Sequence, residues 1–440
     1  MSTQKLVLAS VSKAASRNIR RMSTVMLMLW LVSTPATARA DVVLDWNAIA
    51  ARTVTAGQSP FAQARLMAIT QLAVFEAVNA VTGEYEPYLA VPISAPAITS
   101  AEAAAIVAAH RVLKNYFPTN TSIDTDRMNS LAAIPDGLAK TNGIAVGEAA
   151  AAAMIALRAN DGSTPATSYV PPSSTAAGDW LTTPSCPATG GQFFQWQNLT
   201  PFGITSPSDF LLPAPPALTS NKYTKDYLEV KTVGADDSAA RPADRTDVAR
   251  LYAASSPSFA VSMAARQIAF TNGLSLSENA RAFALIMMGI NDSLIASFYN
   301  KYYYKLWRPE TAIRAGATDG NGKTDGDTTF APFILTPCFP SYPSNHASGT
   351  NGGLEMMRRL FGAAGHDITF TNTVPALGSL PATAITKHYT QLKQIADDVD
   401  DARVYGGIHY RFDQDGGNVL GRAVATEIYK NNLRPVHGKQ

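Results

Sequence analysis

Residues 402–413, ARVYGGIHYRFD, hold three side chains whose types and spacing could do chemistry together. His409 and Asp413 stand four apart, so on a helix they share one face and the carboxylate can accept a hydrogen bond from one imidazole nitrogen. The other nitrogen then keeps its lone pair, free to ligate a metal or attack phosphorus. Arg403 reaches the same point across a bend made by two glycines. A cation beside an oriented imidazole predicts a site for a tetrahedral oxyanion.

Two segments upstream carry groups that suit the same site. In KYYYKLWRP, Lys301 and Arg308 are seven residues apart, which is about two helical turns. We therefore expect both cations to project from one face near the end of a helix, which Pro309 terminates. In FPSYPSNHASGTNGG, Ser344 opens a helix whose first backbone N–H groups can bind an anion. His346 lies on that first turn, where it could touch the anion or deliver a proton. Taken singly, each segment also fits ordinary surface residues.

In this order the three segments resemble the signature of the vanadium-dependent haloperoxidases and of the acid phosphatases that share their fold, including type 2 phosphatidic acid phosphatases. That signature is Lys, six residues, Arg-Pro; then Pro-Ser-Gly-His; then Ser-Arg, five residues, His, three residues, Asp. The matching residues are Lys301, Arg308, Pro309, Pro343, Ser344, His346, Arg403, His409 and Asp413. Residues 290–292 (IND) and the alanine-rich segments before them resemble the secreted haloperoxidase branch more loosely.

Two positions depart from the signature. Asn345 stands where the second segment has glycine, and Ala402 stands where a serine precedes the arginine. The backbone N–H of Asn345 can still donate to an anion, but its side chain would crowd the pocket or add a polar contact. We therefore expect an altered affinity for oxyanions.

The resemblance implies a vanadate cofactor, in a site that phosphate can also occupy. The residues that would bind it are Lys301, Arg308, Ser344, Asn345, Arg403 and His409. His409 would be the metal ligand, and the catalytic residues would be His346, His409, Lys301 and Asp413. In this scheme His346 moves a proton as hydrogen peroxide reacts, and Lys301 polarises the peroxide so that a halide attacks it and a hypohalous species forms. Three permanent cations would offset the charge of the oxyanion.

The same residues would suit an acid phosphatase that hydrolyses phosphate monoesters through a phosphohistidine. His409 would then be the nucleophile, backed by Asp413, and His346 would protonate the leaving alcohol. A non-catalytic oxyanion-binding protein is a third alternative. Phe298 and Phe339 resemble positions near the halide in the haloperoxidase branch, and they favour a vanadate-dependent haloperoxidase with hydrogen peroxide and a halide as its substrates.

Helical periodicity dominates the segments that must position these residues. Apolar residues recur at helical spacing in residues 61–81, 101–117, 143–159, 246–254, 258–271, 276–306, 344–361, 384–405 and 414–431. Ser275 and Glu278 predict a capping box at the start of the longest helix. Clear strand alternation is scarce, so the predicted fold class is all-α, with packed helix bundles. The resemblance specifies the vanadium haloperoxidase/acid phosphatase type.

Composition divides the chain into four parts. Residues 1–40 combine basic residues, a short apolar run and a small-x-small ending, which predicts a signal peptide and a secreted or periplasmic protein. We expect an N-terminal helical region over 41–160, an irregular Pro/Ser/Thr-rich excursion over 161–221, and a helical catalytic region over 222–440 with its motifs at 301–413. No segment after residue 40 is predicted to span a membrane.

Charge and cysteine content narrow the partners and the compartment. Residues 41–440 contain 30 basic and 34 acidic residues, a net charge of −4, so neither nucleic acid nor an anionic membrane is expected as a partner. Cys186 and Cys338 are the two cysteines. Either they form a disulfide that pins the Pro-rich middle of the chain beside the motif region, or they are two unpaired buried thiols.

Overall fold

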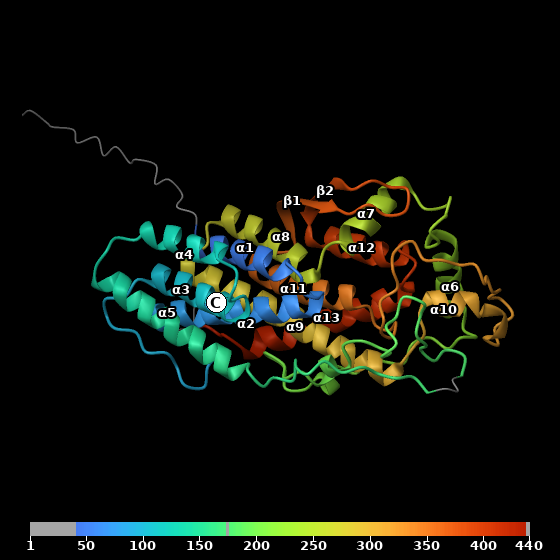
Figure 1. Ribbon diagram of the computed structural model, residues 1–440, viewed down its shortest axis with the longest axis horizontal. Helices are drawn as coiled ribbons and strands as arrows, with labels where there is room; N and C mark the ends of the chain where they lie inside the picture. Colours follow the sequence, from blue (N-terminus) through green and yellow to red (C-terminus); the bar gives the residue numbers. More distant parts are fainter. Residues whose placement is uncertain (1–40, 173–175, 437–440) are drawn as a thin grey trace, which may run out of the picture. The chain divides into compact units, whose positions relative to one another are not determined.

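The computed structural model describes residues 41–172 and 176–436 (Figure 1). The predicted signal peptide therefore lies outside the described residues. The first helices are α1 (Val42–Thr55), α2 (Pro60–Thr82), α3 (Ala101–Tyr116), α4 (Ser122–Ala132) and α5 (Leu138–Leu157). The later helices are α6 (Asn221–Val233), α7 (Ala243–Ala253), α8 (Pro257–Asn272), α9 (Leu276–Tyr304), α10 (Pro309–Arg314), α11 (Asn345–Phe361), α12 (Leu392–Val404) and α13 (Arg411–Asn431).

The helices α2 and α9 form the centre of the packing. α2 lies against α3, α5 and α9, and α9 also lies against α11 and α13. Contrary to the expectation from sequence, both helices are long and apolar enough to cross a membrane, but 89% and 94% of their most apolar windows are buried inside the fold. That burial is the pattern of core helices, whose apolar residues surround the whole helix.

The helices α9 and α11 meet backbone to backbone, and both lead to motif residues. A Cβ atom on Gly352 of α11 would lie 2.4 Å from the carbonyl oxygen of Gly289 and 2.4 Å from the Ser293 hydroxyl, both on α9. Glycine is needed at this crossing because any side chain would separate the helices. α9 carries Lys301 in its last turn, and α11 begins directly after Ser344. The crossing therefore fixes how the two segments approach each other.

A strand pair corrects the helix predicted for residues 384–405. Strands β1 (Ala364–Val374) and β2 (Thr383–Gln391) pair antiparallel, and α12 begins only at Leu392. Along β1 the buried side chains of Ile368 and Phe370 alternate with exposed ones, as in a strand that covers a core on one face. Helices make up most of the described chain, and the predicted all-α class is confirmed for the fold as a whole.

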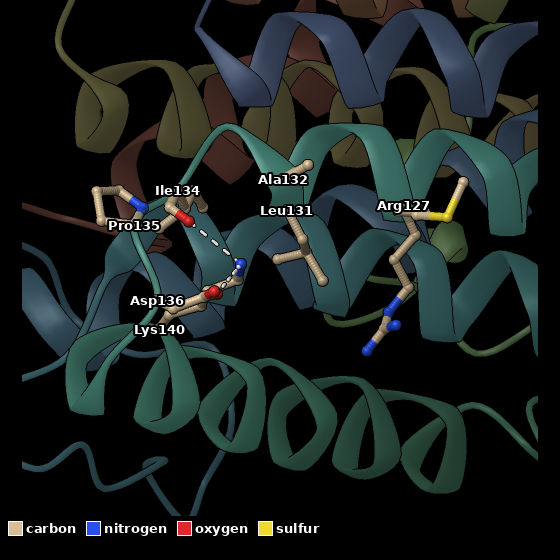
Figure 2. Close-up of a pocket in the computed structure, with 8 residues that line it drawn as sticks. Arg127, Leu131, Ala132, Ile134, Pro135, Asp136 and Lys140 are labelled. Atoms are coloured by element: carbon tan, nitrogen blue, oxygen red, sulfur yellow. Dashed lines mark hydrogen bonds and ion pairs between the residues drawn. The ribbon is translucent and has the colours of Figure 1, made fainter.

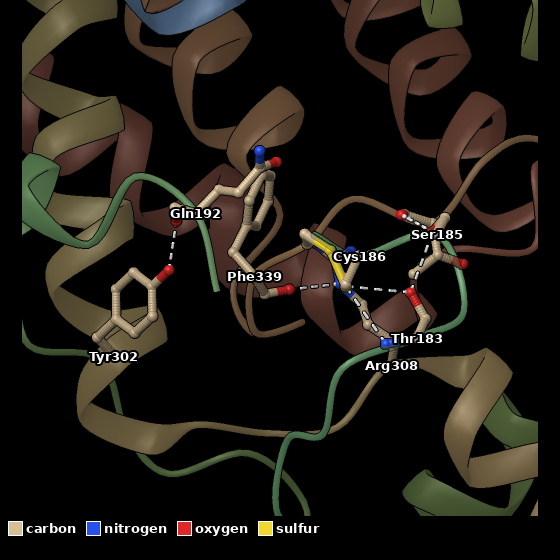
Figure 3. Close-up of a disulfide and its surroundings, with 9 residues drawn as sticks. Thr183, Ser185, Cys186, Gln192, Tyr302, Arg308 and Phe339 are labelled. Carbon is tan, nitrogen blue, oxygen red and sulfur yellow. Dashed lines mark hydrogen bonds between the residues drawn. A yellow bond between two sulfur atoms is a disulfide. The ribbon is translucent and has the colours of Figure 1, made fainter. Parts of the chain in front are cut away.

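The irregular residues 161–221 include two short 3-10 helices, η1 (Phe194–Asn198) and η2 (Pro207–Phe210), and a third, η3 (Gly316–Thr318), follows α10. A disulfide joins Cys186 to Cys338, so the first of the two cysteine alternatives is confirmed (Figure 3). Nearby, the backbone N–H of Gln192 donates to the carbonyl of Cys338 at 2.7 Å, and the Tyr302 hydroxyl donates to the carbonyl of Gln192. The described residues lie within one compact unit; the predicted boundaries at 160 and 221 stay predictions.

Candidate oxyanion site

His409 is held in one tautomer just before α13, whose N-cap is Tyr410. Its Nδ1 lies 2.7 Å from Oδ2 of Asp413, and its Nε2 lies 2.9 Å from Nη1 of Arg308. A guanidinium only donates, so Nε2 accepts and Nδ1 carries the proton that is shared with Asp413. Burial, helped by the charges of Arg308 and Lys301, holds the pKa of His409 well below its ordinary value. The imidazole is therefore neutral, with its lone pair on Nε2.

The carboxylate that orients His409 has further donors. The Ser341 hydroxyl donates to Oδ2 of Asp413 at 2.6 Å, and the backbone N–H of Tyr410 donates to the same oxygen at 3.1 Å. Burial raises the pKa of Asp413 to about 6, and the Ser341 hydrogen bond opposes that rise. Ser341 was not predicted from the sequence, because no spacing rule links it to Asp413.

Three buried cations face this pair. Lys301 Nζ donates to the carbonyls of Pro340 and Ser341 at 2.8 and 2.7 Å. Arg308 Nε donates to the carbonyl of Phe339 at 2.8 Å (Figure 3). Arg403 makes one long contact, 3.5 Å from Nη1 to the carbonyl of Tyr252. In the described part of the chain none of the three forms a salt bridge with a carboxylate.

Burial lowers the pKa of all three cations. That of Lys301 falls well below its ordinary value, with Arg308 as the next cause; that of Arg308 falls to about 10; and that of Arg403 falls to about 9, where Arg308 again contributes. Buried cations without carboxylate partners leave an excess of positive charge. An anion would offset this excess.

Unpartnered donors show where that anion fits. Nη2 of Arg308, Nε of Arg403 and Nδ2 of Asn345 are buried and find no acceptor among the described residues. Ser344 is the N-cap of α11, and its Oγ accepts from the backbone N–H of Ala347 at 3.3 Å, which leaves its own proton to donate. Buried donors need acceptors, and a tetraoxo anion such as vanadate or phosphate has acceptors on every side. The residues present therefore fit vanadate.

His346 lines a pocket of about 240 Å³, and the charges of Arg403 and Lys301 act on its ring. Besides His346, the pocket wall has no acidic or basic side chain; it includes Gln63, Ser255 and Asn372. Desolvation of the ring and the charge of Arg403 lower the pKa of His346 well below its ordinary value, although the backbone carbonyls of Ser255 and Tyr252 oppose the shift. The backbone of Tyr252 is thus a hydrogen-bond partner of both His346 and Arg403. No motif predicted this shared partner.

The structure therefore brings the predicted site residues into one region. The shared helix face predicted for Lys301 and Arg308 is wrong, because α9 ends at Tyr304 and Arg308 is the N-cap of α10. Arg308 contacts His409, and His409 contacts Asp413. Lys301 is linked to Asp413 through Ser341, which bonds to both. The backbone N–H of Ser344 donates to the carbonyl of Asp413 at 2.9 Å, which ties the start of α11 to α13. The roles assigned to these residues stay predictions.

Aromatic rings cover one side of the cations. The centroid of the Phe339 ring lies 5.3 Å from Lys301 Nζ and 5.0 Å from Arg308 Cζ. Phe298 lies 5.4 Å from Phe339, and Phe61 lies 4.7 Å from Phe298. Phe61 comes from α2, far away in the sequence, so periodicity could not have assigned it to the site. These rings lower the local polarity and strengthen electrostatic interactions beside them.

A larger pocket of about 650 Å³ lies elsewhere, along α4 and the loop to α5 (Figure 2). Its wall includes Arg127, Met128, Asp136 and Lys140, and the last two form an ion pair at 2.8 Å. It contains none of the motif residues, so it is separate from the oxyanion site.

Known proteins resemble this chain in sequence and in fold. Residues 281–438 match the family model described as the VCPO second helical-bundle domain. The vanadium chloroperoxidase of Curvularia inaequalis is 24% identical over 169 residues, which are 30% of this chain and 28% of that relative's length. A bacterial vanadium-dependent iodoperoxidase superposes with a TM-score of 0.73 at 21% identity, over 91% of this chain and 97% of its own.

Holo and apo forms of a bacterial vanadium-dependent chloroperoxidase each superpose with a TM-score of 0.69 at 17% identity; they cover 86% and 83% of this chain and 93% and 92% of their own chains. These findings confirm the helical-bundle fold and the resemblance to the vanadium haloperoxidases that the motifs indicated.

Proposed function

We propose that this protein is a vanadate-dependent haloperoxidase that uses hydrogen peroxide to oxidise a halide to a hypohalous species. One observation carries the proposal: Arg308 lies on Nε2 of the oriented imidazole of His409, and Lys301 and Arg403 add two more buried cations whose charges act on that ring, none of the three in a salt bridge among the described residues. The aromatic rings beside Lys301 and Arg308 support it, because a poorly hydrated halide is easier to bring into such surroundings than into water-filled ones.

The chain's own residues would divide the work of holding vanadate. Lys301, Arg308 and Arg403 offset its charge, and Ser344 and the first turn of α11 donate hydrogen bonds. His409 would exchange its hydrogen bond from Arg308 for ligation of the metal through Nε2. When bound, pentavalent vanadate supplies a Lewis-acidic centre that activates hydrogen peroxide towards a halide.

The aromatic rings beside the cations favour halide oxidation over phosphate ester hydrolysis. Desolvation and the charge of Arg403 lower the pKa of His346, which favours the form of the ring that can accept a proton from hydrogen peroxide. In a phosphatase the same histidine would supply a proton to the leaving alcohol, and the charge of a bound phosphate would favour its protonated form. The phosphatase alternative is still supported by His409, whose oriented Nε2 could attack phosphorus.

Parallel assays of one preparation test the proposal. The protein would be loaded with orthovanadate and assayed for bromide and iodide oxidation with hydrogen peroxide, and the vanadate-free protein for nitrophenyl phosphate hydrolysis. We expect halide oxidation that requires vanadate and is abolished by His409→Ala. Hydrolysis without halide oxidation would establish the phosphatase instead, and tight phosphate binding with neither activity would indicate a non-catalytic oxyanion-binding protein.

The compartment is a separate part of the proposal. The composition of residues 1–40 supports a cleaved signal peptide, which would place the enzyme in the periplasm or the medium. Mass spectrometry of the exported protein should give a mature chain that begins at Asp41. A chain that keeps its first 40 residues would contradict this.

A further inference from the structure

We propose that the side chain of Asn345 is an additional hydrogen-bond donor to the bound oxyanion, positioned by Ser297. The proposal rests on the oxyanion site proposed above and adds a contact that a glycine at this position cannot make. The backbone N–H at the start of α11 would still donate. The amide of Asn345 would supply a second donor from the same residue, without any added charge.

The contact between Asn345 and Ser297 fixes which end of the amide is free. The Ser297 hydroxyl donates to Oδ1 of Asn345 at 2.6 Å. Ser297 is 0% exposed and lies on α9 one turn before Lys301, so the amide packs beside the face of α9 that carries the lysine. With Oδ1 occupied by a donor, the NH₂ group is the end that remains. That Nδ2 is buried and has no acceptor among the described residues.

The surroundings of Asn345 indicate what the missing acceptor is. Its chain neighbours are Ser344, the N-cap of α11, and His346, which senses the charges of Arg403 and Lys301. Within the described part of the chain, Arg308 and Arg403 each also carry a buried nitrogen that has no acceptor. A neutral ligand with one acceptor would satisfy one of these donors. A tetrahedral oxyanion can accept from all of them and offset the cations at the same time.

Binding to the vanadate-free protein tests this, with inorganic phosphate as the probe in calorimetry and orthovanadate as a competitor. We expect Asn345→Ala and Asn345→Gly each to weaken phosphate binding about tenfold, which is about 1.4 kcal/mol. Asn345→Asp should weaken it about a hundredfold or more, because a carboxylate oxygen would replace the donor. Ser297→Ala should weaken it about threefold, because the amide is then free to rotate.

A matched control separates anion binding from packing. Asn351 lies on the same helix, is 2% exposed, and donates from Nδ2 to the carbonyl of Ala347 at 3.1 Å and to Oδ1 of Asn418 at 2.6 Å. Asn351→Ala should lower the melting temperature and leave the phosphate Kd within twofold of wild type.

The outcomes distinguish this inference from the proposed function. If wild type binds phosphate and the folded Asn345→Ala and Asn345→Gly variants bind it within twofold as tightly, the amide only packs against α9 and this inference is wrong. If wild type binds neither phosphate nor vanadate, the oxyanion site itself is wrong, and the inference fails with it.

Discussion

Replacing Arg403 with methionine should stabilise the anion-free protein while removing its affinity for oxyanions. Arg403 is 5% exposed, has no carboxylate partner in the described chain, makes one contact of 3.5 Å to the carbonyl of Tyr252, and leaves Nε without an acceptor. Burying a cation in these surroundings lowers the free energy of unfolding, and a bound anion would offset that loss. Methionine fills much of the same space without the charge.

The expected gain follows from the pKa. Burial, with a contribution from Arg308, lowers the pKa of Arg403 to about 9 from above 12, and each pH unit is worth about 1.4 kcal/mol, so the charged form is disfavoured by about 4 kcal/mol. Methionine forfeits packing and a weak hydrogen bond, together about 1 to 3 kcal/mol. We therefore expect the free energy of unfolding of Arg403→Met to rise by about 1 to 3 kcal/mol in anion-free buffer.

The pH dependence gives a second signature of the same cation. Because the folded pKa is below the unfolded one, the unfolded state holds a proton that the folded state releases, and wild-type stability should rise with pH above about 9. Arg403→Met should show less of this rise. With phosphate at 100 times its Kd, the free energy of unfolding of wild type should rise by about 2.7 kcal/mol, while that of Arg403→Met should hardly change. In phosphate the variant should therefore be no more stable than wild type, or less stable.

Urea unfolding with and without phosphate measures these changes. Arg250→Met is the control. Arg250 is also 5% exposed and also has an Nε without an acceptor among the described residues, but its Nη2 donates to the carbonyls of Pro375 and Pro381 at 3.0 and 2.5 Å. Its loss should destabilise the protein at any phosphate concentration. If Arg403→Met proves as destabilising as Arg250→Met in anion-free buffer, Arg403 is a structural residue and the excess-charge argument fails.

Three further changes should have distinct effects. Asp413→Asn should lower vanadate-dependent halide oxidation about a hundredfold, because the amide can donate to Nδ1 of His409 and favour the wrong tautomer; unchanged turnover would contradict the assigned tautomer. Burial raises the pKa of Asp400 to about 7, so the folded state keeps a proton that the unfolded state releases near pH 4, and stability falls as pH rises between these values. Asp400→Asn should therefore be about 1 to 3 kcal/mol more stable than wild type at pH 8 and equal to it at pH 4 in urea titrations. Removing the Cys186–Cys338 disulfide with Cys186→Ser should lower the free energy of unfolding by about 2 to 4 kcal/mol. It should also weaken phosphate binding in calorimetry, because the loop after Cys338 supplies the carbonyls that hold Lys301 and Arg308. An unchanged phosphate Kd would show that the loop keeps its shape without the disulfide.

The sequence was informative where function depends on spacing along one helix or turn. The predicted contact of His409 with Asp413 is present, but His409 precedes α13 and Tyr410 is the N-cap, so the capping turn and not a shared helix face brings the two side chains together. The helix boundaries at Ser275 and Ser344 follow from their caps, because capping is local chemistry. The strand β2 was mistaken for helix because its partner strand is what stabilises it, and its residues run directly into the helical pattern that begins at Leu392.

Contacts that depend on tertiary packing could not be predicted in the same way. Ser341, Ser297 and Phe61 come from a proline-rich loop, the second half of α9 and the N-terminal α2, and none has a spacing relation to the residue that it contacts, which is Asp413, Asn345 and Phe298 in turn. The shortage of carboxylates around the three cations is likewise invisible in a chain whose overall charge is nearly balanced. It became evident only once the partners of each cation were known.

The glycine crossing between α9 and α11 also determines how the oxyanion site can be altered from outside. Lys301 is 12 residues beyond Gly289, and Ser344 is 8 residues before Gly352, about 18 and 12 Å along their helices. A methyl group added at either glycine would clash with the backbone of the other helix, so the two helices would have to tilt or move apart. Because Lys301 and Ser344 are far along their helices from the crossing, even a small tilt would change the distance between them. Laboratory evolution could therefore change the width of the oxyanion site through residues that do not contact the ion. A change in width would alter which size of oxyanion the site prefers.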